Sequence, residues 1–363
     1  MRFTAGREEL SQALKLAMAC AERKSTVPIL GHVLVEARGS LITITASDMD
    51  RQVSITLPAE IQETGSEAVN GNMLADISAA VKGDDIILNS GKDGRAEVKS
   101  GRSRYQVPVL PADDFPKMPQ PEEFKSFVLS GGHFSKAIAD VAYSADTIDT
   151  RPYLCGVFVH AMESAWAAVT TDGKRLSFRS FQPPMGGDGL PASILPSKSV
   201  SLLGKLYTGE HELTLECGKT LWTIRNSRIS FTTKLIDGNF PEYARLIPDR
   251  TQYSVKAAKS ELLSGIVRAA IATDMSRGLK MEFLDNMIRL SASQTDGAES
   301  FDEIEADGPF IPYPVGIPEN QFRDAINMME GDNVIIGIDG AANPIKITDG
   351  RPDAVCVIVP VRI

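Results

Sequence analysis

Long apolar runs are missing from the sequence. No stretch approaches the roughly 18 consecutive apolar residues that a membrane-spanning helix needs. The first nine residues, from Met1 to Glu9, lack the apolar segment of a secretory signal. Hydrophobic residues make up 43% and charged residues 23% of the chain, as is typical of globular proteins. These features argue against a membrane partner and predict a cytoplasmic protein.

Cysteine is scarce, which argues against two further classes of protein. The four cysteines, Cys20, Cys155, Cys217 and Cys356, are far apart and form no Cys-x-x-Cys pair. Structural zinc sites typically contain such pairs, and disulfide frameworks are typical of short, cysteine-rich secreted chains, so we expect neither. The cysteines are expected to be reduced core residues. The four histidines are equally dispersed, and we predict no metal or cofactor.

Sequence motifs for catalysis are also absent. The chain has no phosphate-binding GxxxxGK[ST] loop, no GxSxG nucleophile elbow and no HExxH zinc helix. Carboxylates pair at Asp48/Asp50 and Asp113/Asp114, both on predicted turns. Capping and solvation of those turns is the interpretation that we prefer, and acid–base or metal chemistry is the alternative. We therefore predict no catalytic residue.

The formal net charge is −9. An acidic surface repels duplex DNA, so this charge by itself argues against nucleic-acid binding. The argument fails if the basic residues are segregated on one face, which sequence order does not decide.

A long internal repeat is the strongest feature that the sequence does contain. Gly83, Gly209 and Gly331 each follow a predicted helix and precede a predicted strand, at separations of 126 and 122 residues. Pro116 and Pro241 close the first two copies, 125 residues apart. Regular spacing at independent markers predicts three copies of one domain.

The front half of each copy has the same plan. Apolar stripes at i, i+3, i+4 and i+7 predict helices around Leu10–Met18, Phe134–Val141 and Leu262–Ala270, each followed by a pair of strands. The predicted fold is therefore α+β, with repeated domains at 1–122, 123–249 and 250–363. Each domain consists of two halves, each with a helix and strands.

Several motifs, in order along the chain, resemble those of bacterial DNA sliding clamps, the beta subunit of DNA polymerase III. They are Thr26–Gly31, Ser100–Tyr105, Leu110–Pro116, Thr171–Leu176, Asp237–Tyr243 and the tail Val357–Ile363. The resemblance implies a ring-shaped, head-to-tail homodimer, with helices lining the hole and sheets outside. It implies a non-catalytic processivity factor that encircles duplex DNA without sequence preference, in the cytoplasm at the nucleoid.

The resemblance also implies partners and sites. The partners are a clamp loader and the replicative and repair polymerases, bound through peptides that contain Leu and Phe. The implied DNA contacts are Arg23, Lys24, Tyr153, Lys198 and Lys205. The implied peptide groove consists of Leu154, Thr171, Gly173, Arg175, Leu176, Pro241, Arg245, Leu246, Val359, Pro360, Val361 and Arg362. The implied dimer interface contains Arg102, Arg104, Tyr105, Ile271, Ala272, Glu299 and Glu303.

Two alternative functions stay open at this stage. One is a specialised clamp paralogue, for example one that resists an inhibitor of the housekeeping clamp. The other is an enzyme on a repeat scaffold. In the tail, Val357 to Val359 is expected to form a buried strand that Pro360 ends, because proline has no N–H to donate.

Overall fold

Two compact units make up the computed structural model, and each contains one continuous antiparallel sheet. The structure describes residues 1–21, 27–91, 93–121, 123–148, 150–184, 187–209, 211–272 and 278–363. The first unit comprises Met1–Ser135, Pro184–Pro191 and Lys198–Leu235, and the second comprises Lys136–Pro183, Ala192–Ser197 and Ile236–Ile363. The middle repeat therefore contributes one half to each unit.

The first repeat begins with a strand and a helix. Its elements are β1 (Arg2–Gly6), α1 (Arg7–Met18), β2 (His32–Arg38), β3 (Leu41–Ser47), β4 (Arg51–Pro58), β5 (Glu60–Glu63), β6 (Gly65–Asn70), α2 (Gly71–Ala80), β7 (Asp85–Ser90), β8 (Arg95–Ser100) and β9 (Ser103–Pro111), with 3-10 turns η1 (Pro28–Gly31) and η2 (Ala112–Asp114).

The second repeat follows the same plan. Its elements are β10 (Phe124–Ser130), α3 (Gly131–Val141), β11 (Gly156–Ala161), β12 (Trp166–Thr171), β13 (Arg175–Phe181), β14 (Ser193–Pro196), α4 (Ser197–Leu206), β15 (Glu212–Gly218), β16 (Leu221–Arg225) and β17 (Ile229–Lys234), with 3-10 turns η3 (Ala142–Ser144), η4 (Pro152–Leu154) and η5 (Tyr243–Leu246).

The third repeat ends at the C-terminal tail. Its elements are β18 (Tyr253–Ala258), α5 (Lys259–Ala269), η6 (Ala270–Ala272), β19 (Leu279–Leu284), β20 (Met287–Ser293), β21 (Glu299–Asp307), β22 (Val315–Ile317), α6 (Glu319–Met328), β23 (Asn333–Ile338), β24 (Ile345–Thr348) and β25 (Ala354–Ile358). The first helix of this repeat therefore ends one residue earlier than expected, because Ala270 begins a 3-10 turn.

The two halves of each repeat interlock. The strand before the first helix pairs with the strand after the second, as in β1–β7, β10–β15 and β18–β23. The strand before the second helix pairs with the strand after the first, as in β6–β2, β14–β11 and β22–β19. The same exchange in all three copies confirms the predicted repeat at the level of strand pairing.

Neighbouring repeats join by pairing one strand from each. In the first unit β17 pairs with β4, and Ser230 lies opposite Ser54. In the second unit β13 pairs with β25, and Phe178 lies opposite Val355. Both joints pair the third strand after the first helix of one repeat (β4 or β13) with the third strand after the second helix of the next repeat (β17 or β25).

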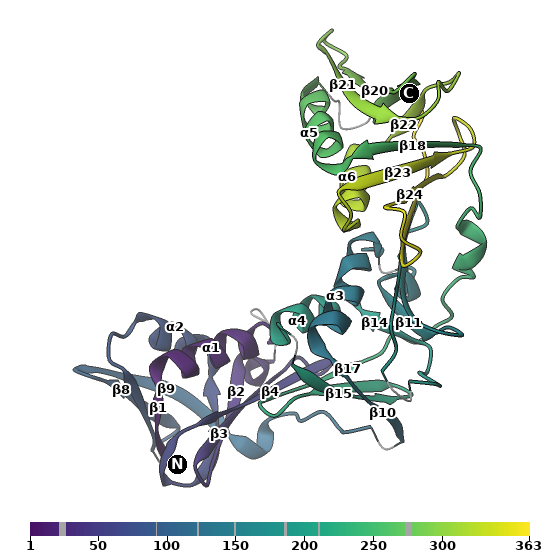
Figure 1. Ribbon diagram of the computed structural model, residues 1–363. Coiled ribbons are helices and arrows are strands. Elements are labelled where there is room, and N and C mark those ends of the chain that lie inside the picture. Colours follow the sequence, from purple (N-terminus) through teal and green to yellow (C-terminus); the bar gives the residue numbers. More distant parts are fainter. Residues whose placement is uncertain are drawn as a thin grey trace. The chain divides into compact units, whose positions relative to one another are not determined.

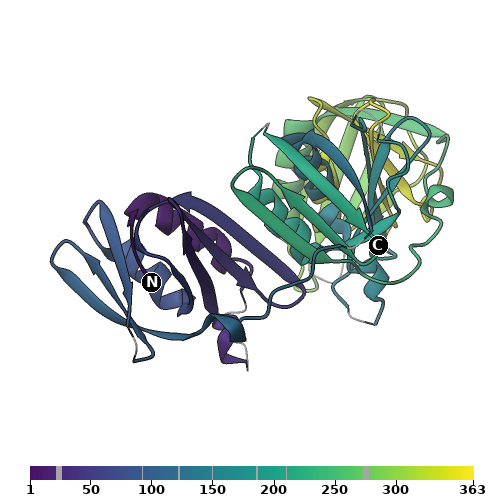
Figure 2. The same ribbon diagram turned by 90° about the horizontal axis from the view of Figure 1, so that it is seen from below.

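The helices pack in pairs on one face of each sheet. In the first unit α1 lies beside α2 and against β3 and β4, and in the second α5 lies beside α6 (Figures 1 and 2). Leu10 and Leu14, one turn apart on α1, are both buried, as predicted from the apolar spacing. Helix α2 begins where the Asn70 side chain accepts a hydrogen bond of 3.0 Å from the Met73 N–H. No helix in the described ranges is long and apolar enough to cross a membrane.

Candidate functional site

The turn between β12 and β13 holds an arginine in a fixed position. Asp172 Oδ1 accepts hydrogen bonds from the N–H groups of Lys174 (2.8 Å) and Arg175 (3.0 Å), and Oδ2 accepts one from Arg175 Nε (3.0 Å). Gly173 takes a φ of +87°, which a residue without Cβ adopts at little cost. The motif Thr171–Leu176 therefore forms a tight hairpin turn, with Thr171 paired to Leu176.

Arg175 also connects this turn to the third repeat. Its Nη1 donates to Asp324 Oδ2 on α6 at 3.3 Å, and its guanidinium lies 5.4 Å from the centre of the Tyr143 ring. The Arg175 side chain is only 17% exposed. A guanidinium with carboxylates on two sides and an aromatic face beneath it keeps one orientation.

An aromatic cluster covers the face of the sheet next to this turn. Phe240 stacks on Phe158 with ring centres 4.8 Å apart, and the Tyr243 hydroxyl lies 2.8 Å from His160 Nε2. Phe240, Tyr243 and Ile247 pack on the buried side chains of Leu176 and Val357. This packing holds the segment from Pro241 to Leu246 against the sheet. Leu246 itself remains 52% exposed.

The C-terminal tail is bonded at two points. The Val359 N–H donates to the Lys174 carbonyl at 2.8 Å, and the Val361 N–H donates to the Gly316 carbonyl of β22 at 2.9 Å. The expected buried strand from Val357 to Val359 is wrong by one residue, because β25 ends at Ile358 and Val359 is 43% exposed. Val359 keeps its backbone bond but turns its side chain to solvent.

The structure thus brings most of the predicted groove residues to one hairpin. Thr171, Gly173, Arg175 and Leu176 belong to the hairpin, the tail bonds to its turn, and the Pro241–Leu246 segment packs on its sheet face. Leu154 and Leu176 are buried, and Leu176 packs beneath Phe240 and Tyr243, whereas Pro241, Arg245, Leu246, Val359 and Arg362 are exposed. The exposed apolar side chains beside an oriented arginine suit an extended peptide with apolar anchors.

The predicted turn at Asp48/Asp50 is confirmed, and Asp48 caps it. It is a second copy of the Asp172 turn, an equivalence that sequence reasoning missed. Asp48 Oδ1 accepts hydrogen bonds from the N–H groups of Asp50 (3.0 Å) and Arg51 (2.6 Å), and Oδ2 accepts one from Arg51 Nε (2.9 Å). The Lys234 N–H donates to the Asp50 carbonyl at 2.8 Å, as Val359 does to Lys174. The signal was present in the sequence as Asp-x-x-Arg at both places, 124 residues apart.

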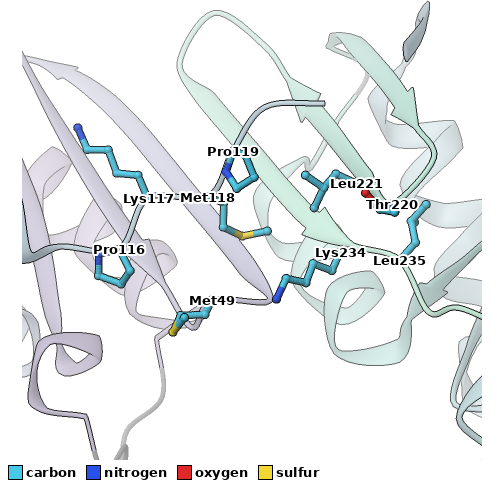
Figure 3. Close-up of a pocket in the computed structure, with 9 residues that line it drawn as sticks. All are labelled: Met49, Pro116, Lys117, Met118, Pro119, Thr220, Leu221, Lys234 and Leu235. Atoms are coloured by element: carbon cyan, nitrogen blue, oxygen red, sulfur yellow. The ribbon is translucent and has the colours of Figure 1, made fainter. Parts of the chain in front are cut away.

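A pocket of about 420 Å³ lies beside this second turn, within the first unit (Figure 3). Six of its nine lining residues are apolar, and none is acidic. They are Met49, Pro116, Lys117, Met118, Pro119, Thr220, Leu221, Lys234 and Leu235.

The predicted DNA contacts differ in how exposed their side chains are and in whether a carboxylate lies near them. Arg23 and Lys24 lie outside the described residues. Lys198 and Lys205, on α4, are exposed, and no described carboxylate comes within 4 Å of either ammonium. Tyr153, in η4, is half-buried. Two other helix cations are paired: Lys136 with Asp140 at 2.7 Å and Arg268 with Asp302 at 2.6 Å.

The predicted interface residues lie on β9 and β21, in the β8–β9 turn and in one 3-10 turn. Arg102 and Arg104 are exposed and Tyr105 is half-buried. In η6, Ile271 is 80% exposed, whereas Ala272 is 6% exposed. On β21 Glu299 is exposed, and Glu303 pairs with Arg289 at 2.7 Å within the same chain. Sequence reasoning missed Phe301, which is 74% exposed between those two glutamates.

A charge cluster connects the second and third repeats within the second unit. Glu330 accepts from Lys136 at 2.6 Å and from Arg179 at 2.7 Å, and its other oxygen accepts from Arg351 at 2.9 Å. The hydrogen bond from Lys136 and, next in size, that from Arg351 lower the pKa of Glu330 to about 2, although partial burial of the carboxyl acts to raise it. Because three cations from different elements converge on this carboxylate, it helps to hold the joint.

This cluster predicts a pH-dependent stability. A carboxyl whose pKa falls from 4.5 unfolded to about 2 folded stabilises the protein above pH 4.5, and loses that contribution as the pH falls toward 2. We expect Glu330→Gln to lower the Tm of the second unit at pH 7 by on the order of 2 °C, a small value because the carboxylate is partly exposed. Calorimetry at several pH values should show the difference from wild type closing below pH 4.5. A difference that persists unchanged toward pH 2 would contradict the assignment.

Cys20, Cys217 and Cys356 are buried, as expected of core residues, whereas Cys155 is half-buried. Burial raises the pKa of the Cys356 thiol to about 11 and that of Cys20 to about 12, so neither is a reactive thiolate at neutral pH. Within the described ranges, no group of three or more His, Cys, Asp or Glu side chains is placed to hold a metal ion.

Comparison with known proteins decides the family. Models of the N-terminal, central and C-terminal domains of the DNA polymerase III beta subunit match residues 1–119, 128–242 and 244–362. The chain belongs to the DNA polymerase III beta subunit family. Family membership confirms the resemblance and the prediction of three repeated clamp domains.

Individual relatives agree over the whole length. The beta sliding clamps of Caulobacter vibrioides and Escherichia coli are 28% and 26% identical to this chain, with 100% of both chains covered in each case. The crystal structure of a Bartonella birtlesii sliding clamp, bound to griselimycin, matches with a TM-score of 0.94 at 28% identity and 100% coverage of both chains. That of a C. crescentus beta sliding clamp matches with a TM-score of 0.95 at 27% identity, covering 100% of this chain and 99% of the other.

Proposed function

We propose that this chain is a DNA polymerase processivity factor, which forms a ring of two chains around duplex DNA. It performs no chemistry: it tethers replicative and repair polymerases to their template. One observation carries the proposal beyond family membership. The same strand-to-strand joint occurs twice within the chain, and the two strands that would form a third such joint, β9 in the first unit and β21 in the second, each have one edge that is paired over only two or three described residues.

The free strands are β9 and β21. Strand β9 pairs with β8 along its length but with β6 only from Val109 to Pro111, and β21 pairs with β20 along its length but with β18 only at Ala306 and Asp307. Each chain thus carries one β9 and one β21. In a head-to-tail pair of chains, β9 of each chain pairs with β21 of the other. Such heterologous contacts close into a ring when the rotation per repeat fits.

Internal symmetry also predicts the register of this contact. The strand registers within the repeats make Ser54, Phe178 and Phe301 equivalent. They likewise make Ser230, Val355 and Arg104 equivalent. Ser54 pairs with Ser230 and Phe178 with Val355, so Phe301 of one chain lies opposite Arg104 of the other. The same register sets Glu303 opposite Arg102.

In the proposed ring the paired helices line the hole and the sheets form the outer wall. DNA is then held by topology, and a few cations on the inward helices need only weak, sequence-independent contact. A closed ring reaches circular DNA only when it is opened, so a clamp loader is a required partner. The site of action is the nucleoid in the cytoplasm, and the domain limits 1–122, 123–249 and 250–363 belong to the same proposal.

The proposed DNA contacts of Arg23, Lys24, Lys198, Lys205 and Tyr153 can be tested at the two exposed lysines of α4. We expect Lys198→Ala with Lys205→Ala to weaken DNA binding equally for unrelated sequences. The slope of log affinity against log salt should decrease by about 0.9 for each phosphate that is no longer neutralised. Fluorescence anisotropy with two unrelated duplexes from 50 to 200 mM salt, roughly the range in which such binding is salt-sensitive, measures both effects. Lys219→Ala, an exposed lysine on the β15–β16 turn, is the matched control. An unchanged slope, or a strong preference for one duplex, would contradict this prediction.

The peptide groove of the proposal lies at the Asp172–Arg175 turn, the Pro241–Leu246 segment and the tail. Polymerases would insert Leu and Phe side chains beside Leu246 and Val359, with Arg175 orienting the peptide backbone or a carboxylate. The test of the overall function is retention on DNA. The loaded protein should stay on nicked circular DNA and leave once that DNA is linearised. Equal retention on both forms would overturn the ring.

A further inference from the structure

We propose that the pocket beside the Asp48–Arg51 turn is a second peptide site, which takes an extended acidic segment with an apolar anchor from another protein. The inference rests on the proposed peptide groove, because the pocket is the internal-repeat equivalent of that groove. Each chain would then offer two docking points of the same kind, one at each joint between repeats.

The equivalence holds residue by residue. The strand registers match Met49 with Gly173 and Lys234 with Val359, and the closing prolines Pro116 and Pro241 occupy the same place. The tail bond from Val359 to Lys174 has its counterpart in the bond from Lys234 to Asp50, both at 2.8 Å. Leu235 corresponds to Pro360, so four of the nine lining residues are equivalents of groove residues.

Met49 gives an independent reason to assign function to the pocket. It has a φ of +71°, a left-handed conformation that side-chain-bearing residues rarely adopt, where the equivalent residue is Gly173 at +87°. Its side chain is nevertheless 52% exposed and lines the pocket. An apolar, flexible side chain kept in solvent on strained backbone suits a binding surface and contributes little to the core.

Charge and size define the occupant. Both charged residues of the lining are cations, Lys117 and Lys234, and their side chains are 54% and 53% exposed. Their present partners, Glu36 at 3.2 Å and Asp50 at 2.9 Å, form solvent-exposed pairs that exchange readily. Lys234 extends toward Met49, and Lys117 extends away from the other labelled side chains (Figure 3).

An acidic residue of the bound segment would therefore meet Lys234. The apolar anchor would enter among Met49, Met118 and Leu221. A volume of about 420 Å³ accommodates one or two large side chains.

Photocrosslinking tests the proposal on the full-length protein. The probe is a labelled peptide, Asp-Asp-Leu-Leu-Phe, with benzoylphenylalanine in place of Phe, and crosslinked residues are identified by mass spectrometry. We expect crosslinks at Met49 or Met118 in addition to crosslinks in the groove. Lys234→Glu should reduce the pocket crosslinks about tenfold, and a peptide with Lys in place of Asp should reverse that effect.

Two variants separate this proposal from that of the groove. Met49→Gly removes the apolar side chain while favouring the observed backbone, so it should fold normally and still lose pocket crosslinks. Leu246→Asp should abolish groove crosslinks and leave those in the pocket. Crosslinks in the groove alone would overturn the second site and leave the proposed function standing, whereas crosslinks at neither place would overturn both. Pocket crosslinks that fall as the protein concentration rises would assign the pocket to a second copy of the chain, and would also overturn the proposal.

Discussion

Replacing Phe301 by arginine is expected to convert the proposed dimer into monomers. In the proposed register Phe301 of one chain lies opposite Arg104 of the other, so the variant sets two guanidinium groups against each other at both joints of the ring. It also removes an aromatic side chain whose burial would contribute about 2 kcal/mol or more at each joint. Phe301 is 74% exposed within a single chain, so the fold of that chain should be unaffected. Sedimentation velocity at micromolar concentration should give the mass of one chain, and retention on nicked circular DNA should disappear.

A charge swap makes the same test specific for the register. Adding Arg104→Glu to Phe301→Arg should restore the dimer, because the two side chains then attract each other across the joint. Arg95→Glu, at an exposed arginine on β8, is the matched control and should not restore it. A Phe301→Arg protein that remains dimeric would show that β21 is not in the interface. Rescue by the control and not by Arg104→Glu would show that the register is wrong.

Two aspartates in the proposed groove are expected to abolish binding of polymerase peptides while leaving the proposed dimer intact. Leu246 and Val359 are 52% and 43% exposed, so Leu246→Asp with Val359→Asp changes a surface and leaves the core unaltered. Apolar anchors contribute most of the energy of such binding, and removal of their pocket should cost about 2 kcal/mol or more, roughly 30-fold in Kd. Titration of a labelled peptide that contains Leu and Phe measures the change in affinity, and sedimentation confirms the dimer.

Met162→Asp is the matched control for the groove variant. Met162 is an exposed apolar residue in the turn between β11 and β12, 45% exposed, and it should not affect peptide affinity. Deleting the tail would be a less specific test, because the Val361 N–H bonds to β22 and removing that bond would disturb the third repeat. Equal affinity of the groove variant and wild type would mean that partners bind elsewhere.

The sequence by itself determined the repeated domain and most of its elements. Helix stripes such as Leu10 and Leu14 and the turn glycines are local signals, because a helix face and a tight turn each depend on residues a few positions apart. The Asp172–Gly173 turn was predictable for the same reason. The resemblance rests on such local motifs and led to the correct family.

Only the tertiary structure decided how the repeats combine. The joints β4–β17 and β13–β25 bring together residues more than 170 positions apart, and no local pattern specifies which strand edges meet. The exposure of Val359 and the pocket at Met49 depend on those pairings, and Phe301 is exposed on β21, which pairs with β18 only at Ala306 and Asp307. The alternation of side chains along a strand determines which residues share a face of the sheet. Which of those residues stay exposed to solvent depends on the strand that pairs with the edge of that sheet, and that strand is distant in sequence.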